Sequence, residues 1–345
     1  MSLLILDGFD GYSNLADVSN QYGMTGSFAS FSTTGGRFGG CALTVSSGDN
    51  AYAVLNGWGS ATELWFGCAI NVGAGQSANT MIGFSGSGGV EATLAIDLST
   101  GTLKAYRGRL GTLLGSSAAG VLAANAWRWI EVHFKLDGST GVFEVWLDDV
   151  QVLNLTGQNT KNSTSTTINA LILGDTSSGA NSIAIDDMYL LDTSGAAPTN
   201  TRLGDLRIST LVPASDASPN NGTPDSGTNH YARVSEGPGW DGDTSYITLM
   251  NSTGQQEMFG LSALPTTPDV IIAVTPTFAS RKLDAGGAAA HSKLKSGATV
   301  QAGASKALST TYAGYRDTPL QNDPNTGAPW TAAAIAALQA GYVVE

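Results

Sequence analysis

The fold is decided by residues Trp129–Asp149, which read WIEVHFKLDGSTGVFEVWLDD. Apolar and polar residues alternate over Ile130–Leu136 and again over Phe143–Leu147, which is the pattern of strands with one buried face. The DGSTG run between them supplies a turn. Three more strand patterns follow, at Val150–Leu155, Ile168–Leu173 and Ile183–Leu191. Consecutive strands of this kind predict an all-β chain built on an antiparallel β-sandwich or jelly roll.

The composition is that of a protein with a large apolar core and a weakly charged surface. The chain has 345 residues, of which 42% are hydrophobic and 13% charged, and 44 residues are glycine. At this length two domains, each with its own core, are expected. The share of charged residues is well below the usual value of about 25%, which suits a β-rich extracellular or virion protein.

The charge and hydropathy patterns exclude several partners. The net charge is −12, from 16 Lys and Arg against 28 Asp and Glu. This surface repels phosphate backbones, and its longest basic run is Arg281-Lys282, so we expect no nucleic-acid partner. No apolar run approaches the roughly 20 residues of a membrane-spanning helix, so we expect no membrane insertion. The apolar residues Leu3–Leu6 meet Asp7 without a preceding basic region, which predicts a strand rather than a signal peptide.

The two cysteines, Cys41 and Cys68, lie in separate strand-like stretches. A disulfide-stabilised domain has more cysteines, and a zinc site has closer spacing. Two buried free thiols are therefore the favoured interpretation, and a single bridge is the alternative.

Two domains joined by a short linker are predicted. The first is a jelly-roll domain over residues 1–193. Residues 194–201 are small and polar and contain a proline, which is typical of a linker. Residues 202–345 form a second domain. The further strands predicted in the first domain are Gly39–Ser46, Ala51–Leu55, Glu63–Val72, Met81–Ser85, Glu91–Asp97 and Thr102–Arg107.

The second domain is predicted to be mostly β, with one short helix near its C-terminus. It opens with a strand over Leu203–Val212, and residues 213–229 read as a loop. Thr331 suits the N-cap of an alanine-rich helix over Ala332–Ala340, and Gly341 suits its C′ position. The other predicted strands are Tyr231–Val234, Ser245–Met250, Glu257–Leu261, Val270–Ser280 and Thr310–Tyr315.

Catalytic motifs are missing. The histidines His133, His230 and His291 have no partners at catalytic spacing, and His133 is expected to be solvated on the polar face of its strand. The nucleophile-elbow, zinc-protease and phosphate-loop motifs are absent. Glu144 and Asp148 share a strand face but lie about 13 Å apart, beyond the roughly 5–9.5 Å of a glycosidase pair. These observations predict that the chain is not an enzyme and has no catalytic residues.

Acidic residues at the two ends of the first domain form a candidate metal site. Asp7 and Asp10 follow the first strand, and Asp186 and Asp187 lie in the last. If those strands pair, Asp7, Asp186 and Asp187 are placed to hold Ca²⁺, the only cofactor considered. The favoured alternative is that these side chains cap turns and accept backbone N–H bonds.

Three tryptophans are candidates for stacking against a sugar. Trp58 and Trp240 lie in glycine-containing loops, and Trp146 lies on the polar face of its strand. An exposed aromatic side chain is a mild sign of a binding surface. Trp58, Trp146 and Trp240 are therefore the predicted carbohydrate-binding residues. The alternative is that each folds back onto its own domain.

Several longer motifs point to one protein family. In the first half they are LILDGFD (Leu4–Asp10), WRWIEVHF (Trp127–Phe134), EVWLDD (Glu144–Asp149) and IDDMYLLD (Ile185–Asp192). In the second half they are RLGDLR (Arg202–Arg207), DGDTSYI (Asp241–Ile247) and DPNTGAPWT (Asp323–Thr331). Together they resemble tailed-bacteriophage virion proteins with an N-terminal concanavalin A-like, or laminin-G-like, jelly roll and its C-terminal region.

The resemblance implies a virion protein assembled in the host cytoplasm. The implied function is that of a non-enzymatic structural protein of the tail or tail fibre that contacts a host-surface glycan or protein. A capsid decoration (cement) protein on the head surface is the alternative, and a glycan-degrading enzyme is the third hypothesis. The implied partners are other virion proteins and host-surface glycans. The second domain would serve virion attachment or oligomerisation, with a homo-trimer favoured.

Overall fold

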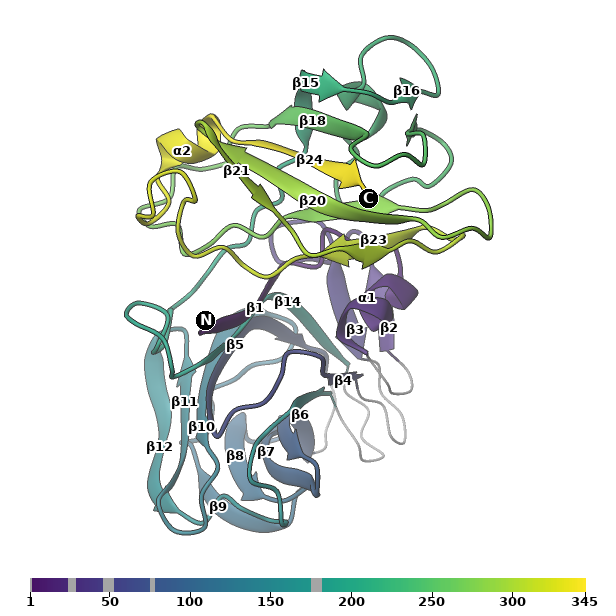
Figure 1. Cartoon of the computed structure of the whole chain (residues 1–345). Coiled ribbons are helices and arrows are strands. Elements are labelled where there is room, and N and C mark those ends of the chain that lie inside the picture. Colours follow the sequence, from purple (N-terminus) through teal and green to yellow (C-terminus); the bar gives the residue numbers. More distant parts are fainter. Residues whose placement is uncertain (1, 24–28, 46–52, 75–77, 175–181) are drawn as a thin grey trace. The chain divides into compact units, whose positions relative to one another are not determined.

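The computed structural model describes residues 2–23, 29–45, 53–74, 78–174 and 182–345. The chain divides into two compact units, and both consist largely of antiparallel strands (Figure 1). The first unit is Met1–Phe9 with Val18–Arg207, and the second is Asp10–Asp17 with Ile208–Glu345. Positions 46, 51 and 52 of the predicted strands lie outside the described residues. In the described part of the chain, none of the helices has the length and apolar character needed to cross a membrane.

The first unit is a sandwich of two antiparallel sheets, so the predicted all-β class is confirmed. The larger sheet has the order β12-β11-β10-β5-β14-β3-β2, with β1 paired to β14, and the smaller has the order β4-β13-β6-β7-β8-β9. The strands of the larger sheet are β1 (Leu3–Asp7), β2 (Ala29–Ser32), β3 (Ala42–Val45), β5 (Glu63–Val72), β10 (Trp127–Lys135), β11 (Gly141–Leu147), β12 (Val150–Gln158) and β14 (Ile183–Asp192). Those of the smaller sheet are β4 (Ala53–Leu55), β6 (Ala78–Gly86), β7 (Gly89–Asp97), β8 (Thr102–Arg107), β9 (Thr112–Ser116) and β13 (Ala170–Leu173). Helix α1 (Leu15–Tyr22) begins in the segment assigned to the second unit and continues into the first.

The core of this sandwich is built by the alternation predicted for β10 and β11. Their register sets Phe134 opposite Phe143 and His133 opposite Glu144. Both phenylalanines are fully buried, and Phe134 stacks on Phe84 of the smaller sheet with ring centroids 4.4 Å apart. These rings therefore join the two sheets through the core.

The cysteines are as predicted. Cys41 and Cys68 are both buried and free. Burial raises the pKa of the Cys68 thiol, so that this side chain stays neutral and packs as a small apolar group.

The structure places the boundary between the units differently from the predicted linker at residues 194–201. The hydroxyl of Ser2 donates to that of Thr199 over 2.7 Å, within the first unit. Arg202 pairs with Glu131 over 2.8 Å, so the first unit extends to Arg207. Leu203–Val212, predicted as a strand, is not one.

Glu131 explains why residues up to Arg207 belong to the first unit. Its side chain is fully buried, and its carboxylate accepts hydrogen bonds from the Tyr189 hydroxyl at 2.6 Å and from Gly204 N at 2.8 Å. Arg202 supplies the compensating positive charge and also pairs with Asp149. Because a buried carboxylate is costly without such partners, the chain after the last strand is held against this sheet.

Replacing Arg202 by alanine is expected to destabilise the first unit by about 2–3 kcal/mol, since Glu131 would lose its cation while staying buried. Calorimetric unfolding of the full chain measures this loss. The matched control is Arg128→Ala, which removes a more exposed pair with Asp148 on the same sheet and should cost less than about 1 kcal/mol. Equal losses in the two variants would contradict the role given to Glu131.

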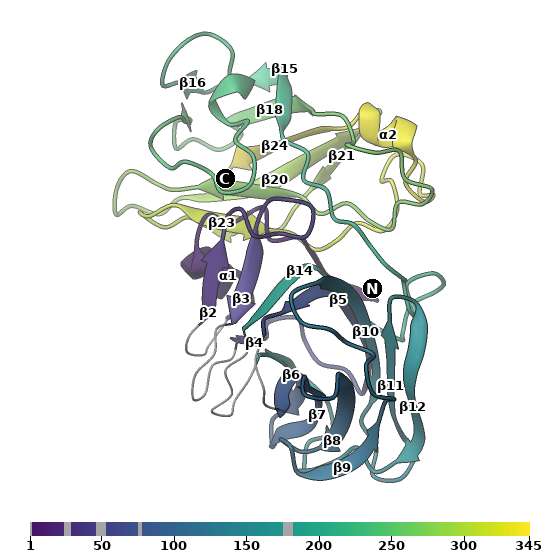
Figure 2. The same ribbon diagram turned by 180° about the vertical axis from the view of Figure 1, so that it is seen from behind.

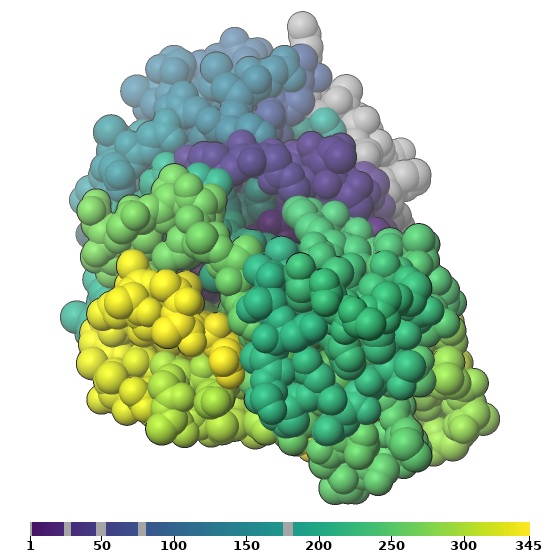
Figure 3. Space-filling model, turned by 90° about the horizontal axis from the view of Figure 1, so that it is seen from above, coloured from purple at the N-terminus to yellow at the C-terminus, as the bar shows by residue number. Residues whose placement is uncertain are grey.

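The second unit is organised around one sheet with the order β15-β18-β24-β20-β21, in which β22 also pairs with β20 (Figure 2). Its strands are β15 (Pro213–Asn220), β18 (Gln256–Leu261), β20 (Ala289–Ser296), β21 (Thr299–Ala302), β22 (Lys306–Ala307) and β24 (Gln339–Val344). Two ribbons pair β16 (Thr223–Pro224) with β17 (Ile247–Thr248), and β19 (Thr277–Ser280) with β23 (Ala313–Arg316). A 3₁₀ helix spans Tyr231–Arg233, and α2 spans Ala332–Ala336. In Figure 3 the yellow C-terminal residues lie among green residues from earlier in this unit.

The C-terminal helix is shorter than predicted. Thr331 is its N-cap and accepts a hydrogen bond from Ala334 N, as expected, but α2 ends at Ala336. The chain then forms β24, which lies between β18 and β20 in the sheet. Gly341 is therefore a central strand residue and not a helix C′ residue. Sheet pairing has overridden the helix propensity of the alanines.

Other predictions in the second unit need correction. Residues 213–220, predicted as loop, form β15 at the edge of the sheet, where its prolines are tolerated because one side needs no ladder hydrogen bonds. Tyr231–Val234 was predicted as a strand but contains the 3₁₀ helix. Strand β20 was not predicted, although buried and partly buried side chains alternate along it.

Candidate functional site

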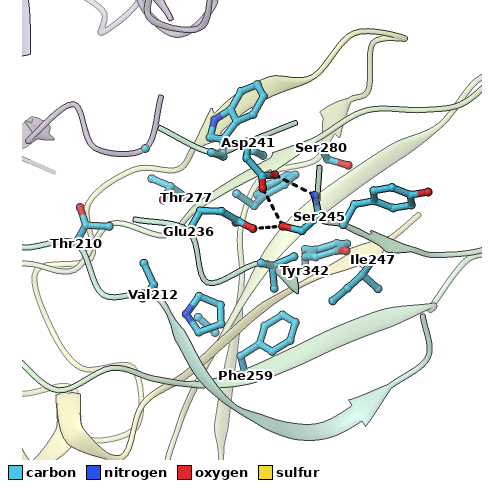
Figure 4. A pocket seen from close by; sticks show the side chains of 18 of the residues that line it. Thr210, Val212, Glu236, Asp241, Ser245, Ile247, Phe259, Thr277, Ser280 and Tyr342 are labelled. Carbon is cyan, nitrogen blue, oxygen red and sulfur yellow. Dashed lines mark hydrogen bonds between the residues drawn. The ribbon is translucent and has the colours of Figure 1, made fainter. Parts of the chain in front are cut away.

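A pocket of about 250 Å³ lies in the second unit, over the face of the sheet that carries Phe259 and Tyr342 (Figure 4). Strands β18 and β24 form its floor, and β19 and the loop of residues 234–247 contribute to its walls. This volume is slightly below the range of about 300–1,000 Å³ typical of small-molecule sites. The pocket therefore suits a small ligand or one terminal group of a larger one.

Aromatic side chains dominate the lining. They are Trp240, Tyr246, Phe259, Phe278, Tyr312 and Tyr342. The rings of Trp240 and Tyr312 have centroids 5.4 Å apart and are tilted by 47°, whereas Phe278 stacks on Tyr342 at 6.0 Å. Burial raises the pKa of the Tyr312 and Tyr342 hydroxyls, so both stay neutral. The pocket thus offers flat apolar faces with polar edges.

Two carboxylates meet at one hydroxyl group in this pocket. The Ser245 hydroxyl lies 2.6 Å from Glu236 Oε1 and 3.1 Å from Asp241 Oδ2, and the three side chains point toward one another (Figure 4). The backbone N–H of Ser245 also donates to Asp241 over 3.2 Å. Because the three residues belong to one short loop, the local turn holds both carboxylates close together.

The basic side chains near the pocket are held by other acids. Arg281 donates to Asp243 over 2.7 Å and lies over the ring of Tyr312 at 5.2 Å. Arg233 donates two hydrogen bonds to the carboxylate of Asp225, of 2.6 and 2.8 Å. These contacts raise the pKa of both guanidinium groups, so each stays charged and committed to its acid.

The arrangement can hold a ring that has apolar faces and hydroxyl or amino edges. The aromatic rings supply the faces, and the carboxylates of Glu236 and Asp241 supply strong acceptors. Within the described ranges no acceptor reaches Nε1 of Trp240, which is itself buried.

Of the three predicted carbohydrate-binding residues, the structure places only Trp240 in this pocket. Trp146 belongs to the first unit, where it packs against Trp65 at 5.2 Å and lies beneath the guanidinium of Arg202. Trp58 is also in the first unit, half-buried in a loop. The three tryptophans are therefore divided between the two units.

His133 is not the solvated strand residue that was predicted. Its side chain is only 14% exposed, and its ring stacks on Trp65 at 4.4 Å. Its Nε2 lies 2.8 Å from Glu63 and its Nδ1 lies 2.8 Å from Glu144. The sequence alone did not show this cluster, because it joins neighbouring positions on three strands, β5, β10 and β11.

The other two histidines also have acidic partners. Nδ1 of His230 lies 2.9 Å from Glu257, and Nδ1 of His291 lies 2.7 Å from Glu345. These partners are 27 and 54 residues distant in the chain, so no local spacing could have predicted them.

The carboxylates predicted to bind calcium contact groups of the protein itself. Asp7 accepts from Phe9 N at 2.8 Å and from the Tyr22 hydroxyl. Asp186 accepts from Arg37 N at 2.8 Å, and the guanidinium of Arg37 lies 3.9 Å from Asp187. In the part of the chain that the structure describes, no group of three or more His, Cys, Asp or Glu side chains could hold a metal ion. The contacts of Asp7 with Phe9 N and of Asp186 with Arg37 N are backbone contacts of the kind that the turn-capping alternative predicts.

Most residues of the pocket were not predicted from the sequence. Its loop reads EGPGWDGDTSY over Glu236–Tyr246 and combines acids, a hydroxyl group and aromatic rings. That combination was a usable signal for Glu236, Asp241 and Ser245. Tyr312, which precedes β23, and Tyr342 of β24 had no such signal, since only the tertiary fold brings them to this loop.

The comparisons with known proteins assign this chain to no family. No protein-family model and no curated protein matches the chain. Among solved structures, "Cellulose induced protein, Cip1" is similar with 18% identity and a TM-score of 0.42, over 58% of this chain and 99% of that one. Alginate lyase Aly36B is similar with 13% identity and a TM-score of 0.39, over 55% and 96%. The metal-free carbohydrate recognition domain of Emp46p has 12% identity and a TM-score of 0.34, over 52% and 96%.

The prediction that the chain is not an enzyme is corrected by these comparisons. Structures of an alginate lyase are among the similar ones, which that prediction did not allow for. At a TM-score of 0.39 and 13% identity the likeness establishes no activity for this chain either. The function of this chain therefore has to be inferred from the residues that line the pocket.

Proposed function

We propose that this protein binds glycans through the aromatic pocket of its second unit. The observation that carries the proposal is the combination of Trp240 and Tyr312 with the carboxylates of Glu236 and Asp241 around one cavity. Aromatic faces stack against the apolar face of a sugar ring, while carboxylates accept hydrogen bonds from its polar edge. A pocket of this lining and size fits one terminal sugar of a longer chain.

The biological setting we propose is the tail or tail fibre of a bacteriophage, where the pocket would contact a host-surface glycan. Support comes from the resemblance of motifs in both halves of the chain, including Asp241–Ile247, which lies in the pocket loop. Counting copies of the protein in purified virions by mass spectrometry tests this setting. A few copies per particle are expected of a tail component, whereas hundreds would favour capsid decoration. Absence from virions would overturn the proposal.

Trp240→Ala is expected to weaken glycan binding at least tenfold, because the largest aromatic face of the pocket is lost. A glycan array with the full chain first identifies a bound oligosaccharide, and titration calorimetry then compares the variant with the original protein. Trp58→Ala and Trp146→Ala are the matched controls, since neither residue lines this pocket. Loss of binding in either control, with Trp240→Ala unchanged, would move the site to the first unit.

A further inference from the structure

We infer that the pocket selects glycans that carry a free, protonated amino group, that is, unacetylated amino sugars, over neutral and acidic glycans. This inference rests on the proposed glycan binding and adds the charge of the ligand. It follows from the charges of the lining, from the hydrogen bonding of Ser245 and from the aromatic rings.

The charged lining is predominantly acidic. The charged side chains that line the pocket are Asp10, Glu236, Asp241 and Arg281. The single cation among them, Arg281, is already paired with Asp243 at 2.7 Å. Arg233 also interacts electrostatically with Asp241 and Glu236, but its hydrogen-bonded partner is Asp225, at 2.6 Å. An incoming carboxylate would therefore be repelled, and an incoming ammonium group would be attracted.

The hydrogen bonds of Ser245 leave acceptors to be filled. A serine hydroxyl has one proton to donate, yet Ser245 Oγ lies within 3.1 Å of an oxygen of both Glu236 and Asp241. Ser245 supplies this proton and one backbone N–H to the four oxygens of the two carboxylates, so acceptor capacity remains for a ligand. An ammonium group brings three N–H donors and a positive charge, which match the acceptors that the loop gathers.

The aromatic rings favour the same ligand. A cation within about 6 Å of a tyrosine or tryptophan ring centroid is attracted by the negative face of that ring. Arg281 already occupies such a position over Tyr312, at 5.2 Å. Trp240 lies next to Tyr312, with the ring centroids 5.4 Å apart, and both rings line the same pocket as the two carboxylates.

The test uses three sets of oligosaccharides that differ in charge: glucosamine oligomers, N-acetylglucosamine oligomers of the same length, and uronic acid oligomers. Binding to the full chain is measured by titration calorimetry at mildly acidic pH, where the free amine is protonated. We expect the glucosamine oligomers to bind at least tenfold more tightly than the acetylated ones, and the uronic acid oligomers not to bind. Raising the salt concentration should reduce this preference.

Two isosteric variants locate the preference. Glu236→Gln and Asp241→Asn keep the shape of the pocket, and each should weaken binding of the glucosamine oligomers at least threefold more than it weakens binding of the acetylated oligomers. The matched control is Asp269→Asn, which removes an exposed charge of the same unit that does not line the pocket. Thermal unfolding of each variant verifies that it is folded.

The possible failures are distinguishable. If glucosamine and acetylated oligomers bind equally, the charge preference is wrong and glycan binding stands. If the preference persists in both variants, it does not arise in this pocket. If no oligosaccharide of the three sets or of a broad array binds, the proposed function fails together with the inference.

Discussion

Phe134→Asp is expected to unfold the first unit. The side chain of Phe134 is fully buried, and it contacts Phe84 at 4.4 Å and Phe143 at 5.7 Å between the centroids. The substitution removes these contacts and places a carboxylate without a partner between two sheets. A buried unpaired charge together with a lost aromatic core residue costs more than about 4 kcal/mol, a large part of the stability of an ordinary domain.

The matched control for this prediction is Val150→Asp. Val150 is also a strand residue of the larger sheet, but its side chain is 63% exposed, so the same new charge stays in water. We expect its effect to be within about 0.5 kcal/mol. Calorimetry of the full chain, combined with limited proteolysis, reports which unit has unfolded. Similar melting temperatures for the two variants would show that the assignment of faces is wrong.

The second large effect is expected for Gly341→Ala. Gly341 lies in β24 opposite Met258 of β18, and a β-carbon at this position would lie 1.8 Å from the carbonyl oxygen of Glu257. Since that oxygen belongs to the backbone of a paired strand, β18 and β24 would have to separate. We expect a loss of about 3 kcal/mol or more in the second unit, and weaker ligand binding, because both strands form the pocket floor.

Gly287→Ala is the control for this prediction, because a β-carbon at Gly287 meets no atom within 4 Å. The substitution should leave stability within about 0.5 kcal/mol of the original protein or raise it slightly, since alanine restricts the unfolded chain. Chemical denaturation followed by tryptophan fluorescence compares the two variants. A Gly341→Ala protein as stable as the control would refute the close approach of these strands.

The local sequence pattern was sufficient to predict the ranges of strands that have clear boundaries. The predicted ranges Glu63–Val72 and Thr102–Arg107 coincide with β5 and β8. In both, turn-forming residues flank a run of strand-forming residues, so neighbours in the chain carry the information. The same reasoning failed for Ala332–Ala340, where the local helix signal was strong but the sheet needed a central strand.

The candidate site was predictable only in part. Trp240 could be proposed because a tryptophan in a glycine-rich loop is unusual, and the acids beside it were visible in the same loop. The aromatic partner Tyr312 is 72 residues away along the chain, and no pattern in the sequence joins the two. For the same reason the contacts of His133 and Glu131 were missed.

The sequence by itself determined the all-β class, the buried thiols and most strands of the first sandwich, because alternation, composition and turns are properties of neighbouring residues. Only the tertiary structure decided where the units divide, how the C-terminal alanines fold and which side chains surround the pocket. These features depend on pairing between segments that are far apart in the chain. The energy of burying a charge or pairing a strand appears only when both segments are in place.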